Sequence, residues 1–235
     1  MSTWSPGPGV FGRPQVVFLR FAPWAIFQNN HPHDLMWPVE MLYAKGIAHA
    51  AGWNATVVDL HVEQLDREGL VRHLVNLRPD LLLIDTMTPT MAYAREIAGA
   101  CLDRLPDLKI WGVGQHATEQ SEDLLYQGSP ISGVLLGEYP GSIADLLACR
   151  GERAVENSAT LSADGRIIRT GSKREINDCD ALPPIDPNGL HLDRYRMRSI
   201  HVPRFGSVRW GYLLTSRGCP FPCTFCSATL RQTYG

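Results

Sequence analysis

Three cysteines stand within eight residues near the end of the chain, at Cys219, Cys223 and Cys226, with the spacing C-x3-C-x2-C. Thiolates bind soft metals, but a structural zinc site usually takes four protein ligands. Three thiolates on one short loop could instead hold three irons of a 4Fe–4S cluster and leave the fourth iron open. Two other interpretations remain: a zinc site completed by Cys179 or by a histidine, or a redox role for the cysteines.

The composition is that of an ordinary globular protein. Of its 235 residues, 44% are hydrophobic and 20% are charged, and the formal net charge is −2. This balance offers no basic surface for nucleic acid or an anionic membrane, and no apolar run reaches the roughly 18 residues of a membrane span. Residues 1–14 are rich in proline and glycine, do not resemble a secretory signal, and are expected to form a flexible arm. We therefore expect a cytoplasmic protein with reduced cysteines.

Strands and helices alternate five times over residues 15–150. Short apolar runs, typical of parallel strands covered on both faces, predict strands at 15–21, 55–60, 81–85, 109–113 and 132–137. Apolar residues at helical spacing follow these runs, and the first helix is expected over about 38–51. The helix after the fourth strand is expected to end in Leu124 and Leu125. The alternation predicts an α/β fold, a doubly wound parallel five-stranded Rossmann-like domain.

The alternation stops at about residue 150, and residues 151–209 have a different pattern. The segment "SATLSADGRIIRTG" predicts a β-hairpin that turns at Asp164-Gly165. The proline-rich segment after it is typical of a linker. Residues 210–216, "WGYLLTS", then predict an apolar strand that leads directly into the cysteine loop.

The loops after the third, fourth and fifth predicted strands share one edge of the sheet, where open α/β sheets bind their ligands. They carry hydroxyl groups, glycines that allow close backbone approach, and one acidic residue, at Thr86, Thr88, Thr90, Gly112, Gly114, Gly137 and Glu138. Ordinary turn and helix-capping chemistry is the alternative explanation for these threonines and glycines.

The segment "RGCPFPCTFCSA" resembles the cluster loop of the radical S-adenosylmethionine (radical SAM) enzymes, in which an aromatic residue precedes the third cysteine. Here that aromatic residue is Phe225, which the resemblance implies is a SAM-binding residue. The resemblance also implies that Cys219, Cys223 and Cys226 bind a 4Fe–4S cluster whose open iron binds SAM. Residues 210–235 would then begin a partial (β/α) barrel that is truncated in this chain.

The first domain resembles the N-terminal domain of the cobalamin-binding radical SAM enzymes, on the segments "LLLIDTMTPTMAYAREIA", "WGVGQHATEQSEDLL" and "GVLLGEYPGSIADLL". The segment "LPPIDPNGLHLDRYR" resembles the connector of those proteins. The resemblance implies that residues 15–150 bind cobalamin. The contacts it implies are Thr86, Thr88, Thr90, Gly112, Gly114, Gln115, His116, Gly137 and Glu138.

The histidines do not match the cobalamin pattern Asp-x-His-x-x-Gly, in which the histidine ligates cobalt. Asp59 and His61 supply two of its residues, but the glycine is missing and the segment follows the second predicted strand. His31 and His33, after the first strand, do not match the pattern either. We interpret His116 as a residue that packs in its loop, since a lone histidine is more often structural than a metal ligand.

The resemblance implies a cobalamin-dependent radical SAM enzyme, with methyl transfer to an unactivated carbon as the expected reaction. Radical ring rearrangement and oxidative cyclisation are alternatives, because a fold does not determine a reaction. A non-catalytic corrinoid-binding module with a structural metal site is a further alternative. The expected partners are a small-molecule or peptide substrate and an external electron donor similar to flavodoxin or ferredoxin, but neither nucleic acid nor a membrane. The sequence leaves the substrate and the catalytic residues open, and we expect this span alone to be inactive.

Overall fold

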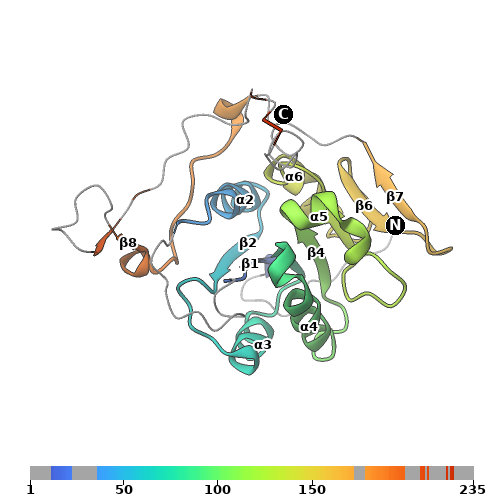
Figure 1. The fold of residues 1–235 in the computed structure, drawn as a ribbon, viewed down its shortest axis with the longest axis horizontal. Helices are drawn as coiled ribbons and strands as arrows, with labels where there is room; N and C mark the ends of the chain where they lie inside the picture. The colour runs from blue at the N-terminus through green and yellow to red at the C-terminus, as the bar shows by residue number, and fades with distance from the viewer. Residues whose placement is uncertain are drawn as a thin grey trace.

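A mixed sheet of seven strands forms the centre of the molecule (Figure 1). The computed structural model describes residues 12–22, 36–171, 178–198, 207–209, 211, 221, 223 and 224. The strands of the sheet are β1 Gln15–Arg20, β2 Asn54–Asp59, β3 Leu81–Asp85, β4 Lys109–Val113, β5 Gly133–Leu135, β6 Ser158–Leu161 and β7 Ile167–Thr170. Their order is β2-β1-β3-β4-β5-β6-β7, and the first five are parallel. The predicted doubly wound α/β class is therefore confirmed.

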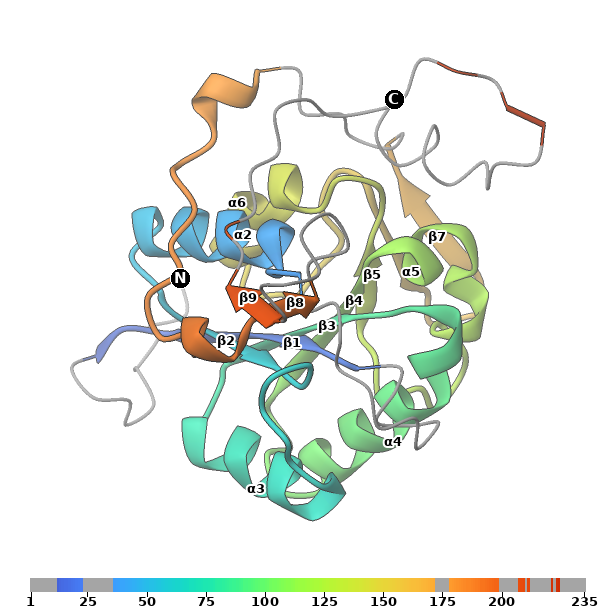
Figure 2. The same ribbon diagram turned by 60° about the vertical axis from the view of Figure 1, so that its left-hand side comes forward.

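Helices cover both faces of the sheet, as Figure 2 shows. The helices are α2 Val39–Ala50, α3 Arg67–Leu77, α4 Met91–Leu102, α5 Gln115–Glu119 and α6 Pro140–Ala148. Short 3-10 turns lie at η2 Thr88–Thr90, η3 Ser121–Asp123, η4 Cys179–Ala181 and η5 Leu192–Arg194. The apolar sides of α2 and α6 form one core with the sheet, and those of α3, α4 and α5 form a second core on the opposite face. Each central strand is thus buried on two sides.

The strand sequences account for this two-sided burial. In β1, Val17 and Leu19 belong to the α3–α4 core, whereas Val16 and Phe18 belong to the α2–α6 core. All four side chains are fully buried. Side chains alternate between the faces of a strand, so a strand covered by helices on both sides needs a continuous apolar run.

The predicted boundaries agree with β3 and β4, but two later elements differ. The helix after β4 is shorter than expected, because α5 ends at Glu119 and a 3-10 turn follows it. Leu124 and Leu125 are nevertheless buried, so core packing rather than helical periodicity explains their apolar character. The fifth strand was expected over 132–137, but β5 contains only three residues. After it, the Leu136 N–H donates to the Asn157 carbonyl, 2.7 Å away.

The predicted hairpin forms, and it joins the sheet rather than lying apart from it. β6 pairs antiparallel with β5, and β7 pairs antiparallel with β6. The turn places Gly165 at φ +82°, which glycine adopts without strain. The prediction of a five-stranded, fully parallel sheet is therefore corrected to seven strands, of which two are antiparallel. The local pattern predicts the hairpin, but it does not say which strand the hairpin pairs with.

The connector after the hairpin is described over residues 178–198, and it contacts the first domain between Pro183 and Tyr195. It ends in β8 Arg196–Arg198, which pairs antiparallel with β9 Ser207–Arg209. Most of the predicted strand at 210–216 lies outside the described residues, as do Cys219, Phe225 and Cys226. Cys223 is described and is exposed.

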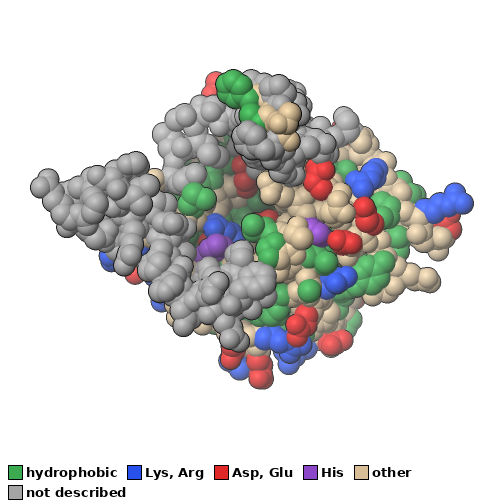
Figure 3. All heavy atoms as spheres, viewed as in Figure 1, with side chains coloured by type: hydrophobic (Ala, Val, Ile, Leu, Met, Phe, Trp, Pro, Cys, Tyr) green, Lys and Arg blue, Asp and Glu red, His purple; other side chains and the backbone are tan. Residues whose placement is uncertain are grey.

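The visible surface over α3 and α4 carries acidic and basic side chains side by side (Figure 3). Within the part of the chain that the structure describes, no helix is both long and apolar enough to span a membrane.

Candidate functional site

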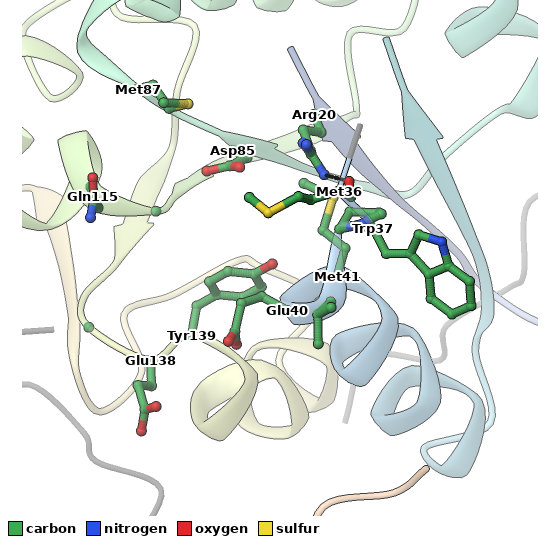
Figure 4. Close-up of a pocket in the computed structure, with 14 residues that line it drawn as sticks. Arg20, Met36, Trp37, Glu40, Met41, Asp85, Met87, Gln115, Glu138 and Tyr139 are labelled. Carbon is green, nitrogen blue, oxygen red and sulfur yellow. Dashed lines mark hydrogen bonds between the residues drawn. The ribbon is translucent and has the colours of Figure 1, made fainter. Parts of the chain in front are cut away.

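A pocket of about 370 Å³ opens at the carboxyl ends of β1, β3, β4 and β5, beside the start of α2 (Figure 4). The order β2-β1-β3-β4 reverses direction between β1 and β3, and open α/β sheets place ligands at such a switch point. The lining residues are Arg20, Met36, Trp37, Pro38, Val39, Glu40, Met41, Asp85, Met87, Gly114, Gln115, Gly137, Glu138 and Tyr139. Four of the predicted contacts, Gly114, Gln115, Gly137 and Glu138, are among them.

Gly114 gives the pocket its shape where β4 ends. Its φ is +94°, and a Cβ at this position would overlap Oδ1 of Asp85 and lie 3.2 Å from the Thr86 carbonyl oxygen. Only glycine satisfies both the backbone conformation and the close approach. The absence of a side chain here keeps the β3 and β4 ends close together with the Asp85 carboxyl between them.

Asp85 is the last residue of β3, and its carboxyl group faces the pocket. Burial raises its pKa from 3.8 to about 6, Arg20 opposes this shift, and the negative charges of Asp59 and Glu40 add to it. A carboxyl group with this pKa changes its charge near neutral pH and can accept or donate a hydrogen bond. Asp85 is thus the pocket residue whose hydrogen-bonding role is most sensitive to pH.

Arg20 forms the opposite part of this wall, at the end of β1. Its Nη1 donates to the Met36 carbonyl oxygen at 3.0 Å, as Figure 4 shows, and lies 3.6 Å from Oδ2 of Asp59. Asp59 is fully buried at the end of β2 and also accepts a hydrogen bond from the Tyr195 hydroxyl at 2.6 Å. The guanidinium group is therefore held between a buried carboxylate and the backbone next to the pocket.

Two buried threonines hold the backbone behind the β4–β5 side of the pocket. Thr86 Oγ1 donates to the Val113 carbonyl oxygen at 2.9 Å and accepts from the Ala117 N–H at 3.1 Å. Thr118 Oγ1 donates to the Gly114 carbonyl oxygen at 2.8 Å and accepts from the Gly137 N–H at 3.1 Å. Thr86 was predicted as a contact, but it is fully buried and does not line the pocket. Thr118 likewise supports the backbone behind the pocket, and the sequence analysis did not identify it.

Three other predicted contacts lie beside the pocket rather than in its lining. Thr90 is buried, and its hydroxyl exchanges hydrogen bonds with the backbone of Met87, which is ordinary turn chemistry. Gly112 is also buried, and a Cβ there would lie 3.1 Å from both Leu124 and Val134. Thr88 is exposed, with its Oγ1 3.1 Å from Nδ1 of His116. The turn chemistry considered as an alternative accounts for Thr90, whereas Gly112 lies within β4 and permits close packing of the core.

His116 is 5% exposed, and its Nδ1 faces Thr88 in the loop after β3. Its Nε2 lies 3.2 Å from Oδ2 of Asp123, close enough for an ion pair, but no hydrogen bond forms there. His61 is also absent from the pocket lining, and burial with the nearby Arg20 lowers its pKa to about 4. Neither histidine is positioned as a ligand for a metal in the pocket.

The remaining lining combines apolar side chains with a few polar ones. Met36 and Met41 lie between Tyr139 and Arg20 in Figure 4, and the Glu138 side chain points away from Tyr139. Glu138 is 3% exposed, so it contributes mainly its backbone to the pocket. Sequence reasoning missed Arg20, Asp85 and Tyr139. The first two could have been found as polar residues that end otherwise apolar strands.

Two of the three cysteines outside the cluster motif have structural positions, whereas Cys179 is exposed. Cys101 is fully buried in the α4 core, and burial raises the pKa of its thiol to about 11. Cys149 is partly buried, and its Sγ donates to the Leu146 carbonyl oxygen at 3.3 Å. Within the described ranges, no group of three or more His, Cys, Asp or Glu side chains could hold a metal. The cluster cysteines are not tested by this finding, because Cys219 and Cys226 lie outside those ranges.

Comparison with curated proteins finds enzymes that carry similar segments. The chain is 24% identical over 198 residues to the anaerobic magnesium-protoporphyrin IX monomethyl ester cyclase of Rubrivivax gelatinosus, covering 81% of the chain and 34% of that protein. The same-named cyclase of Cereibacter sphaeroides is 27% identical, with 81% of the chain and 31% of that protein covered. An uncharacterised methyltransferase of Pyrococcus horikoshii is 25% identical, and the alignment covers 74% of this chain and 37% of that protein. The chain thus spans about a third of the length of these relatives.

Solved structures with a similar fold include a cobalamin-dependent radical SAM enzyme and a radical SAM methyltransferase. OxsB, solved with aqua-cobalamin and S-adenosylmethionine, superposes with a TM-score of 0.58 at 12% identity, covering 69% of this chain and 22% of that one. TsrM, a radical S-adenosylmethionine methyltransferase of Kitasatospora setae, gives a TM-score of 0.52 at 16% identity. The superposition covers 67% of this chain and 30% of TsrM. At these identities the likeness concerns the fold.

Residues 31–147 match the B12 binding domain family, and this range contains every lining residue of the pocket except Arg20. The chain therefore contains a B12 binding domain, and its fold is similar to that of a cobalamin-dependent radical S-adenosylmethionine enzyme.

Proposed function

We propose that the pocket at the β1–β3 switch point binds cobalamin, and that the chain supplies this cofactor to an enzyme that cleaves S-adenosylmethionine. One observation carries the proposal: the pocket lies at the ligand-binding edge of the sheet, inside the segment that matches the B12 binding domain. In this proposal Cys219, Cys223 and Cys226 hold a 4Fe–4S cluster, and Phe225 contacts SAM.

The chemistry of the lining fits a corrin ring. Such a ring has apolar faces and primary amides at its edge, so it requires apolar contact together with hydrogen-bond donors and acceptors. Met36, Met87 and Tyr139 provide apolar surface, and Asp85 and Gln115 provide hydrogen-bonding groups. None of the described lining residues is a histidine or a cysteine, so these residues offer cobalt no imidazole or thiolate.

Methyl transfer to an unactivated carbon is the proposed reaction. The relatives named as methyltransferases support it. When bound, the cluster supplies the electron that cleaves SAM, and cobalamin supplies a transferable methyl group. The task of the described residues is to bind and orient the corrinoid and to keep it beside the domain that follows. We further propose a cytoplasmic setting, a small-molecule or peptide substrate, and an electron donor of the flavodoxin or ferredoxin type.

Oxidative cyclisation is the second candidate, because the relatives from Rubrivivax and Cereibacter are named as cyclases. The two reactions differ in the fate of the SAM methyl group. With methyl-labelled SAM and the rest of the enzyme present, label in the product supports methyl transfer, whereas an unlabelled product with a new ring supports cyclisation.

Cobalamin binding is tested by equilibrium dialysis of the full chain against hydroxocobalamin under anaerobic conditions. The substitution Met87→Glu places a charge in the lining and should weaken binding about tenfold or more, since an unpaired carboxylate would be desolvated by the ligand. The control Ile168→Glu changes another exposed apolar residue, on β7, which is 50% exposed against 41% for Met87, and it should bind as the wild type does. A wild-type chain that neither carries nor takes up a corrinoid refutes the proposal.

The cluster is tested by anaerobic reconstitution followed by iron and sulfide counting and EPR spectroscopy. Replacing Cys219, Cys223 or Cys226 with alanine should abolish the cluster, because each would supply one of only three thiolates. Replacing Cys101 or Cys149 with serine should leave it intact. A full cluster in the Cys223→Ala protein contradicts the assignment, and bound zinc in the wild type instead supports a non-catalytic module with a structural metal.

A further inference from the structure

The connector over residues 178–198 is attached to the first domain by buried polar contacts, which is unusual for a simple linker. Lys45 on α2 is only 5% exposed, and its Nζ lies 3.1 Å from Oδ2 of Asp186. The same amine donates to the carbonyl oxygen of Asn188. Because a buried ammonium group is unfavourable without partners, these connector residues stabilise Lys45 and hold the connector on α2.

The helix surface also accommodates the connector sterically. A Cβ at Gly46 would lie 3.1 Å from Cγ of Pro183 and 3.2 Å from the Pro184 carbonyl oxygen. The glycine therefore permits a close approach between α2 and the connector. His49, on the next turn, places its Nδ1 3.2 Å from Oδ2 of Asp186.

A second attachment lies at the carboxyl end of β2. Tyr195 is fully buried, and its hydroxyl donates to Oδ2 of Asp59, which is also fully buried. Burial and the charge of Asp59 raise the pKa of Tyr195, so the hydroxyl remains a hydrogen-bond donor. The neighbouring Arg194 donates from Nη1 to the Val62 carbonyl oxygen at 3.3 Å.

This second attachment continues into the pocket wall. The same oxygen of Asp59 that accepts from Tyr195 lies 3.6 Å from Nη1 of Arg20. That nitrogen donates to the Met36 carbonyl oxygen, and both Arg20 and Met36 line the pocket. An unbroken series of polar contacts thus joins the connector to the cofactor pocket, through one carboxylate that serves both sides.

We infer that Tyr195 is a positioning residue for the pocket: by binding Asp59 it determines where Arg20 lies, and it thereby couples the connector to corrinoid binding. This inference rests on the proposed function. Since the coupling is a free energy between two sites, it acts in both directions, and a bound corrinoid also stabilises the docked connector.

A double-mutant cycle in the full chain tests the inference, with hydroxocobalamin affinity measured by equilibrium dialysis. Tyr195→Phe keeps the ring but removes the hydroxyl, and should weaken binding about 5-fold. Arg20→Gln should also weaken binding. In the Arg20→Gln background, Tyr195→Phe should have no further effect, because Tyr195 acts through Arg20. A residue that only stabilises the fold would instead lower affinity by the same factor in both backgrounds.

Tyr126→Phe serves as the matched control, because Tyr126 is 39% exposed and lies outside the pocket lining. It should bind hydroxocobalamin as the wild type does. Unchanged affinity in Tyr195→Phe, or losses that multiply in the double variant, overturns the inference while leaving the proposed function intact. A wild-type chain that binds no corrinoid overturns both. Thermal unfolding of each variant shows whether the compared proteins are folded.

Discussion

The two sides of the pocket are built on different principles. On the β1–β3 side, Arg20 and Asp85 present ionisable side chains, and their state depends on residues distant in sequence. On the β4–β5 side, Gly114 and Gly137 line the pocket with backbone atoms, and the buried Thr118 hydroxyl forms hydrogen bonds with both glycines. The β1–β3 side, called here the charged side, therefore responds to charge and pH. The β4–β5 side, called the fixed side, has a shape that its backbone determines. A pocket with this division can hold a large rigid ligand on one side and adjust its hydrogen bonding on the other.

Gly114→Ala should have the largest effect on stability, because it adds a side chain to the backbone of the fixed side where the ends of β3 and β4 lie close together. The new methyl group would overlap the Asp85 carboxyl and occupy a φ of +94°. We expect a loss of about 3 kcal/mol or more in the free energy of unfolding, measured by urea denaturation at pH 7.

Gly128→Ala is the control for Gly114→Ala, since Gly128 has a φ of +84° but no neighbour within 4 Å of the place that a Cβ would take. It should show only the backbone strain, about 1–2 kcal/mol. Adding Asp85→Ala to Gly114→Ala should restore part of the loss by removing the overlap. Equal losses at Gly114 and Gly128 would show that close approach between the two sides does not matter.

Asp85→Asn tests the charged side through pH dependence. The folded-state pKa of about 6 lies above the ordinary 3.8, so the folded protein binds more protons than the unfolded chain between these values. Stability should therefore fall as pH rises from about 4 to about 6, by at most about 3 kcal/mol, and stay level above that. The asparagine variant should lack this fall and be more stable than the wild type at pH 7.

Urea denaturation at pH 4, 5, 6 and 7 measures the difference between wild type and Asp85→Asn. The charged neighbours that face Asp85 are Arg20, Asp59 and Glu40, and all three are retained in the variant. Asp164 is exposed on the hairpin turn, and Asp164→Asn is therefore the control that should leave the pH profile of this window unchanged. A wild-type profile that rises with pH across the window would contradict a buried carboxyl at this position.

The two sides also differ in how far they can be predicted from sequence. The strands and the loops that form the fixed side follow from local patterns, since apolar runs, glycines and threonines occur at regular points after each strand. Gln115 and Gly137 were expected at the site and do line it. The charged side depends instead on contacts such as that of Tyr195 with Asp59, which are 136 positions apart. Spacing along the chain contains no signal for a contact of this kind.

On the fixed side, residue type alone also does not distinguish residues that could contact a ligand from residues that only support the backbone behind the pocket. Thr86, Thr88 and Thr90 were grouped because all three are hydroxyl residues in one loop, yet Thr86 and Thr90 are buried and Thr88 is exposed. Thr86 precedes the 3-10 turn at 88–90, and both its N–H and its hydroxyl donate to the Val113 carbonyl at the end of β4. Within the turn, the Thr90 hydroxyl donates to the Met87 carbonyl, whereas Thr88 is exposed. Burial in three dimensions, rather than the type of residue, decides the role.

Thr86→Val should show how strongly the buried hydroxyls hold the fixed side. The substitution keeps the shape but removes one donor and one acceptor, so the Val113 carbonyl and the Ala117 N–H each lose a partner. We expect a loss of about 1–3 kcal/mol in the free energy of unfolding and weaker hydroxocobalamin binding, measured by urea denaturation and dialysis. Unchanged stability would mean that these hydrogen bonds are replaced by others on relaxation.

Thr88→Ala should have the smallest effect, and it completes the comparison within one loop. Thr88 is exposed, and its hydroxyl contacts Nδ1 of His116 from the solvent side, where water can take its place. Stability should change by less than about 0.5 kcal/mol, and hydroxocobalamin affinity should stay within about twofold, in the same two assays. If Thr88→Ala instead matches the loss in Thr86→Val, the loop acts as one cooperative unit. The fixed side would then owe its shape to the Thr88–His116 contact as much as to the buried hydroxyls behind it.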